Sequence, residues 1–166
     1  MLLAHPAVIE AVDVVFPNYY PVWADVKVEQ AITWLHQKHQ QIVSVAQGKP
    51  VIISETGWPS SGKKRGEAVP SPENASFYFL NFVSWARANN VDYFYFAAFD
   101  EPWKTEGTWG PHWGVWGKDG NMKSGMEDVF DAKTVPDNWS DEEIPGGHGD
   151  PVITFIYVPP YGSRGD

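Results

Sequence analysis

Carboxylates stand at the ends of two apolar runs in this sequence. Glu55 follows the β-branched residues 51–53, and Asp100 and Glu101 follow the aromatic run 93–99. A carboxylate beside buried strands is costly unless it is paired or takes part in chemistry. Two carboxyl groups about 5–5.5 Å apart carry out retaining glycoside hydrolysis, one as nucleophile and the other as acid/base. These residue types therefore point to glycosidase chemistry, and the alternative for Glu55 is a charged strand end without a catalytic role.

Three apolar runs predict the strands that must position these carboxylates. They lie at residues 12–17, 51–55 and 93–99, and helical periodicity over 27–46 and 71–89 separates them. Uninterrupted apolar strands that alternate with helices are typical of a parallel sheet with right-handed crossovers. Polar residues at the carboxyl ends of such strands meet at one edge, where α/β proteins assemble their sites. We therefore expect an α/β fold with its site at that edge.

Local signals set the expected helix ends. Asp25 is the expected cap of the first helix, and Ser71 is the expected cap of the second, with Pro72 at its first helical position. A short third helix is expected at residues 121–130, although Gly125 weakens it. These boundaries leave long loops after the second and third strands, at the same edge as the carboxylates.

The composition favours a neutral ligand over a charged one. Nine Trp, seven Tyr and nine Phe make 15% of the chain aromatic, and flat aromatic faces pack against sugar rings as well as within a core. A net charge of −9 argues against nucleic acid or an anionic membrane surface as a partner.

No apolar run is long enough to span a membrane, and residues 1–6 lack the basic flank of a signal peptide. The chain therefore reads as the middle of a protein.

No metal or other cofactor is expected. The chain has no cysteine, which excludes disulfides and thiolate chemistry. His36 and His39 lie three residues apart on the first expected helix and could share a metal ion, but no third ligand stands near them. Surface or half-buried histidines are the better interpretation of this pair.

The composition divides the chain into three regions. Residues 1–131 contain the strands and helices described above and form part of an α/β domain. Residues 132–151 are rich in Pro, Gly, Asp and Glu, which predicts a linker. Residues 152–158 alternate like one strand, and one strand cannot fold alone. Residues 152–166 are therefore expected to begin a further strand or a truncated second domain.

Four segments resemble glycoside hydrolase family 17, the β-1,3-glucanases and related β-1,3-glucosyltransferases. Residues 51–62, VIISETGWPSSG, resemble the family signature over its full length. Residues 18–21 resemble its N-x-Y-P segment, and residues 99–104 resemble its F-[DN]-E-x-x-K segment. Residues 112–114 resemble the aromatic-glycine step that follows. The segments occur in the family's order over about residues 7–130, and they are closer to bacterial and fungal members than to plant ones.

The resemblance implies the carboxyl-terminal part of a (β/α)₈ barrel and a retaining mechanism. It implies that Glu55 is the nucleophile, that β-glucan is the partner and that the location is extracytoplasmic. It also implies a set of substrate-binding residues around the nucleophile: Asn18, Tyr20, Trp58, Glu101, Trp103 and Lys104.

The chain departs from the family pattern in what it lacks. The family's acid/base glutamate lies in a G-N-E segment on the fourth strand, and this sequence contains no G-N-E. Many relatives also carry an acidic residue where this chain has Ala97 and Ala98. Glu10 precedes the first strand, at the wrong end of the sheet, and Glu106 lies in a long loop, so neither is expected to replace the missing acid. The chain therefore resembles a fragment that carries the nucleophile without its upstream barrel half, and it is expected to be inactive alone.

Three interpretations remain open from the sequence. The first is an enzyme that hydrolyses β-1,3-glucan or transfers its glucosyl units, of which this chain is the nucleophile-bearing part. The second is a half-barrel that binds glucan through its tryptophans without catalysis. The third is a truncated sequence with no independent function, whose unpaired strand edge invites aggregation.

Overall fold

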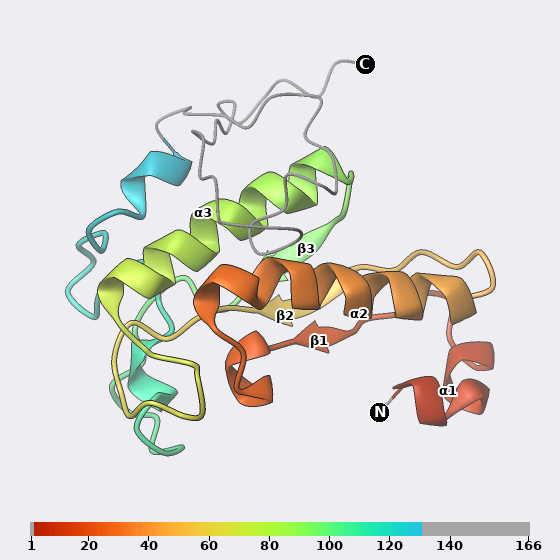
Figure 1. The fold of residues 1–166 in the computed structure, drawn as a ribbon, viewed down its shortest axis with the longest axis horizontal. Coiled ribbons are helices and arrows are strands. Elements are labelled where there is room, and N and C mark those ends of the chain that lie inside the picture. Colours follow the sequence, from red (N-terminus) through yellow and green to blue (C-terminus); the bar gives the residue numbers. More distant parts are fainter. Residues whose placement is uncertain (1, 131–166) are drawn as a thin grey trace.

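The computed structural model describes residues 2–130, which contain a parallel sheet covered on one face by two helices (Figure 1). The strands are β1 (Asn18–Tyr19), β2 (Ile53–Thr56) and β3 (Tyr93–Tyr95), in the order β1-β2-β3. Helices α2 (Ala31–Val45) and α3 (Pro72–Ala88) provide the crossovers. The α/β class with parallel strands is confirmed. The linker and the further strand expected after residue 131 lie outside the described residues.

The remaining helical elements are short. They are η1 (Leu2–Ala4), α1 (Pro6–Glu10), η2 (Pro21–Ala24), η3 (Val28–Gln30), η4 (Gly110–His112) and η5 (Glu127–Val129). The helix expected at residues 121–130 is wrong, because only the single turn η5 forms there. Gly125 has φ +83°, a left-handed conformation that interrupts a right-handed helix before it can build.

The two long helices begin for different reasons. The Ser71 side chain accepts a hydrogen bond of 3.1 Å from the Asn74 N–H, so the expected cap of α3 is confirmed. Asp25 is not the cap of α2. It takes φ 60° after η2, and its carboxylate accepts a 2.7 Å bond from the Arg65 guanidinium. This ion pair joins residues forty apart, so no local pattern predicts it.

The first and third strands differ from their expected ranges. Pairing of the first strand begins at the isolated bridge from Val15 to Val51, and the Pro17 carbonyl then accepts from the Ser54 N–H. The third strand leaves β2 after Tyr95, and residues 97–100 pair with residues 113–116 instead. The expectation that residues 93–99 form a buried strand is wrong, since none of these residues is buried and Phe94 and Phe99 are more than half exposed.

The core lies between the sheet and the two helices. Ile53 and Thr56 of β2 are fully buried, and the Thr56 hydroxyl is hydrogen-bonded to the Tyr78 hydroxyl of α3 at 2.5 Å. The Phe82 ring of α3 lies 4.7 Å from the Tyr93 ring of β3. This aromatic packing fixes α3 against β2 and β3, and much of the aromatic excess is therefore core.

Candidate active site

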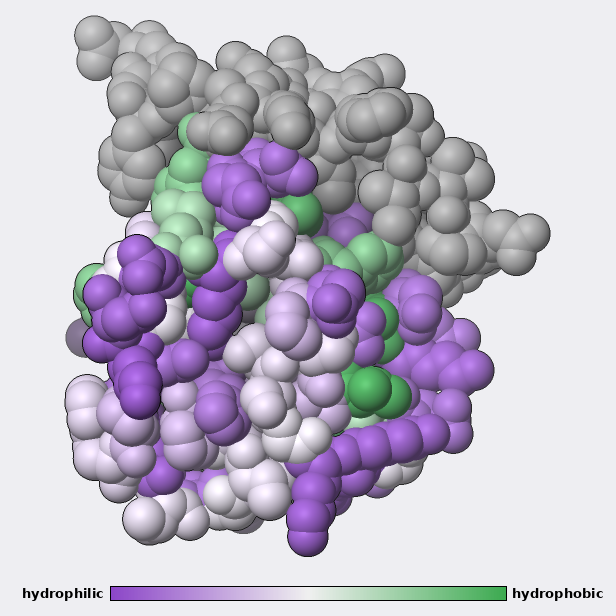
Figure 2. All heavy atoms as spheres, turned by 90° about the vertical axis from the view of Figure 1, so that its left-hand side faces the viewer, coloured by the Kyte–Doolittle hydropathy of each residue, from purple (hydrophilic) through white to green (hydrophobic). Residues whose placement is uncertain are grey.

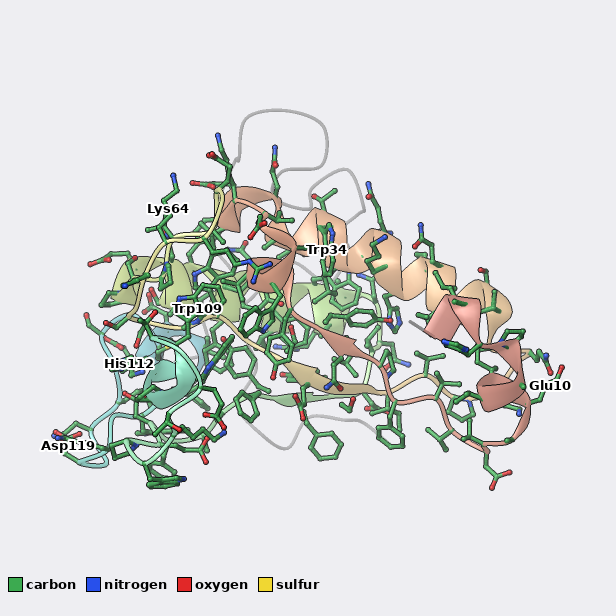
Figure 3. All side chains as sticks on the ribbon, turned by 90° about the horizontal axis from the view of Figure 1, so that it is seen from below. Glu10, Trp34, Lys64, Trp109, His112 and Asp119 are labelled. Atoms are coloured by element: carbon green, nitrogen blue, oxygen red, sulfur yellow. The ribbon has the colours of Figure 1, made fainter. Side chains whose placement is uncertain are left out.

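The loops that follow the strands gather at one end of the molecule. Figure 1 shows the chain leaving β1 and β2 on the same side, where residues 59–70 and the segment around residue 110 lie. In Figure 3, Lys64, Trp109 and His112 lie at this end and Glu10 lies at the opposite end. The expected site edge is therefore present, and Glu10 is far from it.

A bulge in β2 turns two consecutive side chains to the same face. Ile53 pairs with Tyr93 and Thr56 pairs with Tyr95, so three steps along β2 match two along β3. Ile53 and Thr56 both point into the core beneath the helices, and Ser54 therefore lies on the open face together with Glu55. Simple strand alternation would place Ser54 and Glu55 on opposite faces, which is why the sequence pattern gave no signal for Ser54.

Glu55 accepts a hydrogen bond from the phenol of Tyr20, the residue that follows the neighbouring strand β1. The Tyr20 hydroxyl donates to Oε2 of Glu55 over 2.8 Å, and β1 pairs Asn18 directly with Glu55. Burial, and then the hydrogen bond to Glu55, raise the pKa of Tyr20 well above its usual range. The phenol therefore stays protonated and can donate to the carboxylate at any working pH.

Asn18 is held by Ser54 rather than by Glu55. The Ser54 hydroxyl donates to the Asn18 side-chain oxygen, and it lies 3.1 Å from the Phe16 carbonyl. Ser54 thus holds the Asn18 amide by its oxygen, and the N–H₂ group can donate to a ligand on the open face.

Glu101 and Lys104 form an ion pair beside the aromatic rings that pack around Tyr20. Their Oε2 and Nζ atoms lie 2.5 Å apart, and each side chain is 25% exposed. The Lys104 ammonium lies 4.4 Å from the centre of the Phe96 ring. The Tyr20 ring meets Phe96 edge-on at 6.2 Å. The two carboxylate-bearing segments thus share the Tyr20 and Phe96 rings, and Trp113 closes the group with its ring 5.2 Å from that of Tyr20.

The two predicted tryptophans lie in different environments. Trp58 is 1% exposed, its indole N–H donates to the Val69 carbonyl, and its ring packs near Tyr78. Its prediction as a substrate-binding residue is therefore corrected, because the core encloses the ring and its contacts support the chain after β2. Trp103 is 71% exposed and lies beside the Glu101–Lys104 pair in the chain.

The surface at this end is polar. Figure 2 faces it, and purple and near-white residues dominate while green residues form small separate groups.

Within residues 2–130 no three His, Cys, Asp or Glu side chains converge as metal ligands. His36 accepts from the Trp85 indole, and His39 is packed against Tyr19 and Trp85. In the same part of the chain, no helix has the length and apolar character needed to cross a membrane.

The chain is similar to known β-1,3-glucan enzymes. The BtgE/BtgC glycoside hydrolase domain matches residues 1–114. The Aspergillus clavatus protein named probable glucan endo-1,3-beta-glucosidase btgC is 33% identical over 138 residues, which cover 72% of this chain and 20% of that protein. The Candida albicans glucan 1,3-beta-glucosidase is 34% identical over 74% of this chain and 43% of its own length.

Solved structures give the same relation. The glycoside hydrolase family 17 β-1,3-glucanosyltransferase from Rhizomucor miehei is 38% identical, with a TM-score of 0.69 over 73% of this chain and 45% of its own. An active-site mutant of that enzyme was solved in complex with laminaritriose. An endo-laminarinase from Formosa shares the fold at 23% identity, with a TM-score of 0.64. The chain thus spans less than half the length of these relatives.

Proposed function

The chain belongs to glycoside hydrolase family 17, through its BtgE/BtgC domain, and from that membership we propose that it is the nucleophile-bearing part of a retaining enzyme acting on β-1,3-glucan. The observation that carries the proposal is the contact between the Tyr20 phenol and the Glu55 carboxylate at the carboxyl ends of two parallel strands. One Glu55 oxygen is oriented by the phenol, which leaves the other for attack on the anomeric carbon.

The neighbouring side chains have distinct proposed roles. The Asn18 amide N–H₂ group donates to a sugar hydroxyl while Ser54 holds the amide oxygen. The Lys104 ammonium and Glu101 carboxylate bind sugar hydroxyls and keep a fixed charge pattern near Glu55. The exposed indole of Trp103 offers a flat face to a glucosyl ring.

We propose that the acid/base comes from a polypeptide segment beyond these 166 residues. Among the described carboxylates at the site edge, Glu101 is paired with Lys104 and Asp100 with Lys123. Glu106 is exposed in the loop that leads to η4. Without a proton donor for the leaving group, the 166 residues alone are expected to leave laminarin uncut. The location that best fits a polysaccharide substrate is extracytoplasmic.

Transglycosylation is the second candidate function. The observation that favours it is the similarity to a β-1,3-glucanosyltransferase at 38% identity. Hydrolysis and transfer share the glycosyl-enzyme intermediate and differ in whether water or a sugar hydroxyl attacks it. Product analysis on laminari-oligosaccharides separates them, because only transfer makes products longer than the substrate. A third candidate, a half-barrel that only binds glucan, predicts retention on the polymer with no covalent step.

The test is covalent trapping of Glu55. The activated reagent 2-deoxy-2-fluoro-β-laminaribiosyl fluoride has a leaving group that needs little protonation. It therefore labels a retaining nucleophile even where proton donation is weak. We expect intact-mass analysis of the chain, expressed with the reading frame upstream of it, to show one added glycosyl group on Glu55. Glu55→Gln is expected to abolish both the label and laminarin cleavage, whereas Glu10→Gln, at the other end of the molecule, keeps both. Unchanged laminarin cleavage by Glu55→Gln would reject the assignment.

A further inference from the structure

Lys123 is bonded to three segments that form the site edge. Its ammonium lies 2.7 Å from Oδ1 of Asp100, 2.7 Å from the Ser60 hydroxyl and 3.4 Å from the His112 carbonyl. The Lys123 and Asp100 side chains are each only 15% exposed. Lys123 also lies beyond residues 1–114, the part matched by the family domain.

The Asp100 contact reaches the Glu101 segment. Asp100 directly precedes Glu101, and its Oδ1 also accepts a 2.9 Å hydrogen bond from the Gly114 N–H. One carboxylate oxygen therefore joins the chain after β3 to the chain after η4, and the Lys123 charge balances it. The backbones of these two segments lie in close contact at Gly114, because an added Cβ there would lie 2.2 Å from the Asp100 backbone nitrogen.

The other two contacts reach the β2 and Trp113 segments. Ser60 follows β2 along the chain, and its N–H donates to the His112 carbonyl over 2.9 Å. His112 directly precedes Trp113, whose ring packs edge-on against Tyr20. The Lys123 ammonium therefore lies where the chain after β2 meets the turn that places Trp113.

We propose that Lys123 is a positioning residue for the glucan site. Its single cation fixes three loops relative to one another. One of them carries Glu101, Trp103 and Lys104, which are proposed to bind sugar, and another carries Trp113, whose ring packs against Tyr20. This inference rests on the proposed function for its kinetic consequence. It requires no contact between Lys123 and substrate, and its structural part stands without catalysis.

Loss of the cation has a defined physical effect. Without Lys123, the Asp100 carboxylate is left largely buried next to Glu101 with one backbone donor, which is an unfavourable state for a charge. The segment relaxes toward water and carries Glu101 with it. Small misplacements of groups around a reacting centre cost about tenfold to a hundredfold in rate.

The experiment compares Lys123→Met with Lys123→Arg and with Lys118→Met, a matched change at an exposed lysine on the same segment. The trapping rate of Glu55 at saturating reagent and the affinity for laminaritriose are measured for each. We expect Lys123→Met to lower the trapping rate about tenfold with affinity changed less than about threefold. Lys123→Arg and Lys118→Met are expected to stay near the parent rate. Adding Asp100→Asn to Lys123→Met is expected to recover part of the loss, because it removes the unpaired charge.

A parent-like trapping rate in Lys123→Met would overturn the kinetic part of the inference, and so would an equal loss in Lys118→Met. Hydrogen exchange of the Gly114 amide tests positioning without chemistry, and we expect it to speed up in Lys123→Met only. Unchanged Gly114 exchange would overturn the inference even if Glu55 is never labelled. Absence of label in the parent protein, together with faster Gly114 exchange in Lys123→Met, would instead reject the proposed function alone.

Discussion

The hydrogen bond from Tyr20 to Glu55 is the residue-scale contact with the clearest consequence. Tyr20→Phe removes only the hydroxyl and keeps the ring that packs on Phe96 and Trp113. A hydrogen bond to a charged group is worth about 1.5–3 kcal/mol, so we expect the Glu55 trapping rate to fall about 10- to 100-fold. Laminaritriose affinity, measured by calorimetry, is expected to change little.

The adjacent tyrosine supplies the matched control. The Tyr19 hydroxyl is buried and has no hydrogen-bond partner in the described part of the chain. Tyr19→Phe is therefore expected to leave the trapping rate unchanged and to keep or raise the thermal midpoint. Equal rate losses in both variants would show that the Tyr20 hydroxyl has no specific role.

Residue type alone did not separate site aromatics from core aromatics. Glu55 and Tyr20 were predictable from their motifs at strand ends, and the structure brings them into contact. Trp58 belongs to the same motif, yet its ring lies in the core, where it packs near Tyr78 of α3. Lys123 was missed because its contacts join positions 23 and 63 residues apart, and no local pattern reports them.

At the scale of elements, the absence of a side chain at Gly57 allows the chain after β2 to lie close to the chain after β3. A Cβ at this position would stand 2.1 Å from the Phe96 carbonyl oxygen, and the Phe96 N–H donates to the Thr56 carbonyl over 2.8 Å. Gly57→Ala must push the two backbones apart, which we expect to cost about 3 kcal/mol or more of folding free energy. Gly110→Ala is the control, because its nearest obstacle is the flexible end of Glu106. Chemical denaturation of both variants measures the difference.

His39 of α2 packs against Tyr19 of β1 and Trp85 of α3, and its burial makes the folding stability depend on pH. Burial, and then the nearby His36, lower the pKa of His39 from 6.5 to about 4. The unfolded chain therefore takes up this proton at a higher pH than the folded chain. The contribution of His39 is present above about pH 6.5 and is lost as the pH falls toward 4, by up to about 3 kcal/mol. His39→Leu is expected to flatten that part of the stability curve, and His5→Gln, at an exposed histidine, is not.

Element boundaries show which signals act locally. The start of α3 was predictable, because the Ser71 cap and Pro72 act within one turn. The end of β3 was not predictable, because residues 97–100 pair with the segment 113–116 and not with β2. The bulge in β2 was also hidden, since it is defined only by the pairing of β2 with β3.

At the scale of the whole molecule, the sheet has one covered and one open face. Val15 and Tyr19 of the first strand are buried on the helix side, and the rings of β3 that pack on α3 are partly buried there. Phe16 and Phe94 alternate with these residues and are 50% and 64% exposed. β1 and β3 are the edge strands of the described sheet. Exposed aromatic side chains on an open sheet face with free edges favour self-association.

We therefore predict that the 166-residue chain on its own associates through this face. Each buried Phe side chain contributes about 1.5–3 kcal/mol, so pairing two open faces is favourable. The double variant Phe16→Ser with Phe94→Ser is expected to shift sedimentation toward the monomer, whereas Val43→Ser, at an exposed position on α2, is not. Expression with the upstream reading frame is expected to give the same shift without any substitution, because the remaining barrel strands would cover the face. A parent chain that sediments as a monomer with a cooperative melt would contradict this prediction and would show that the three strands suffice for a stable fold.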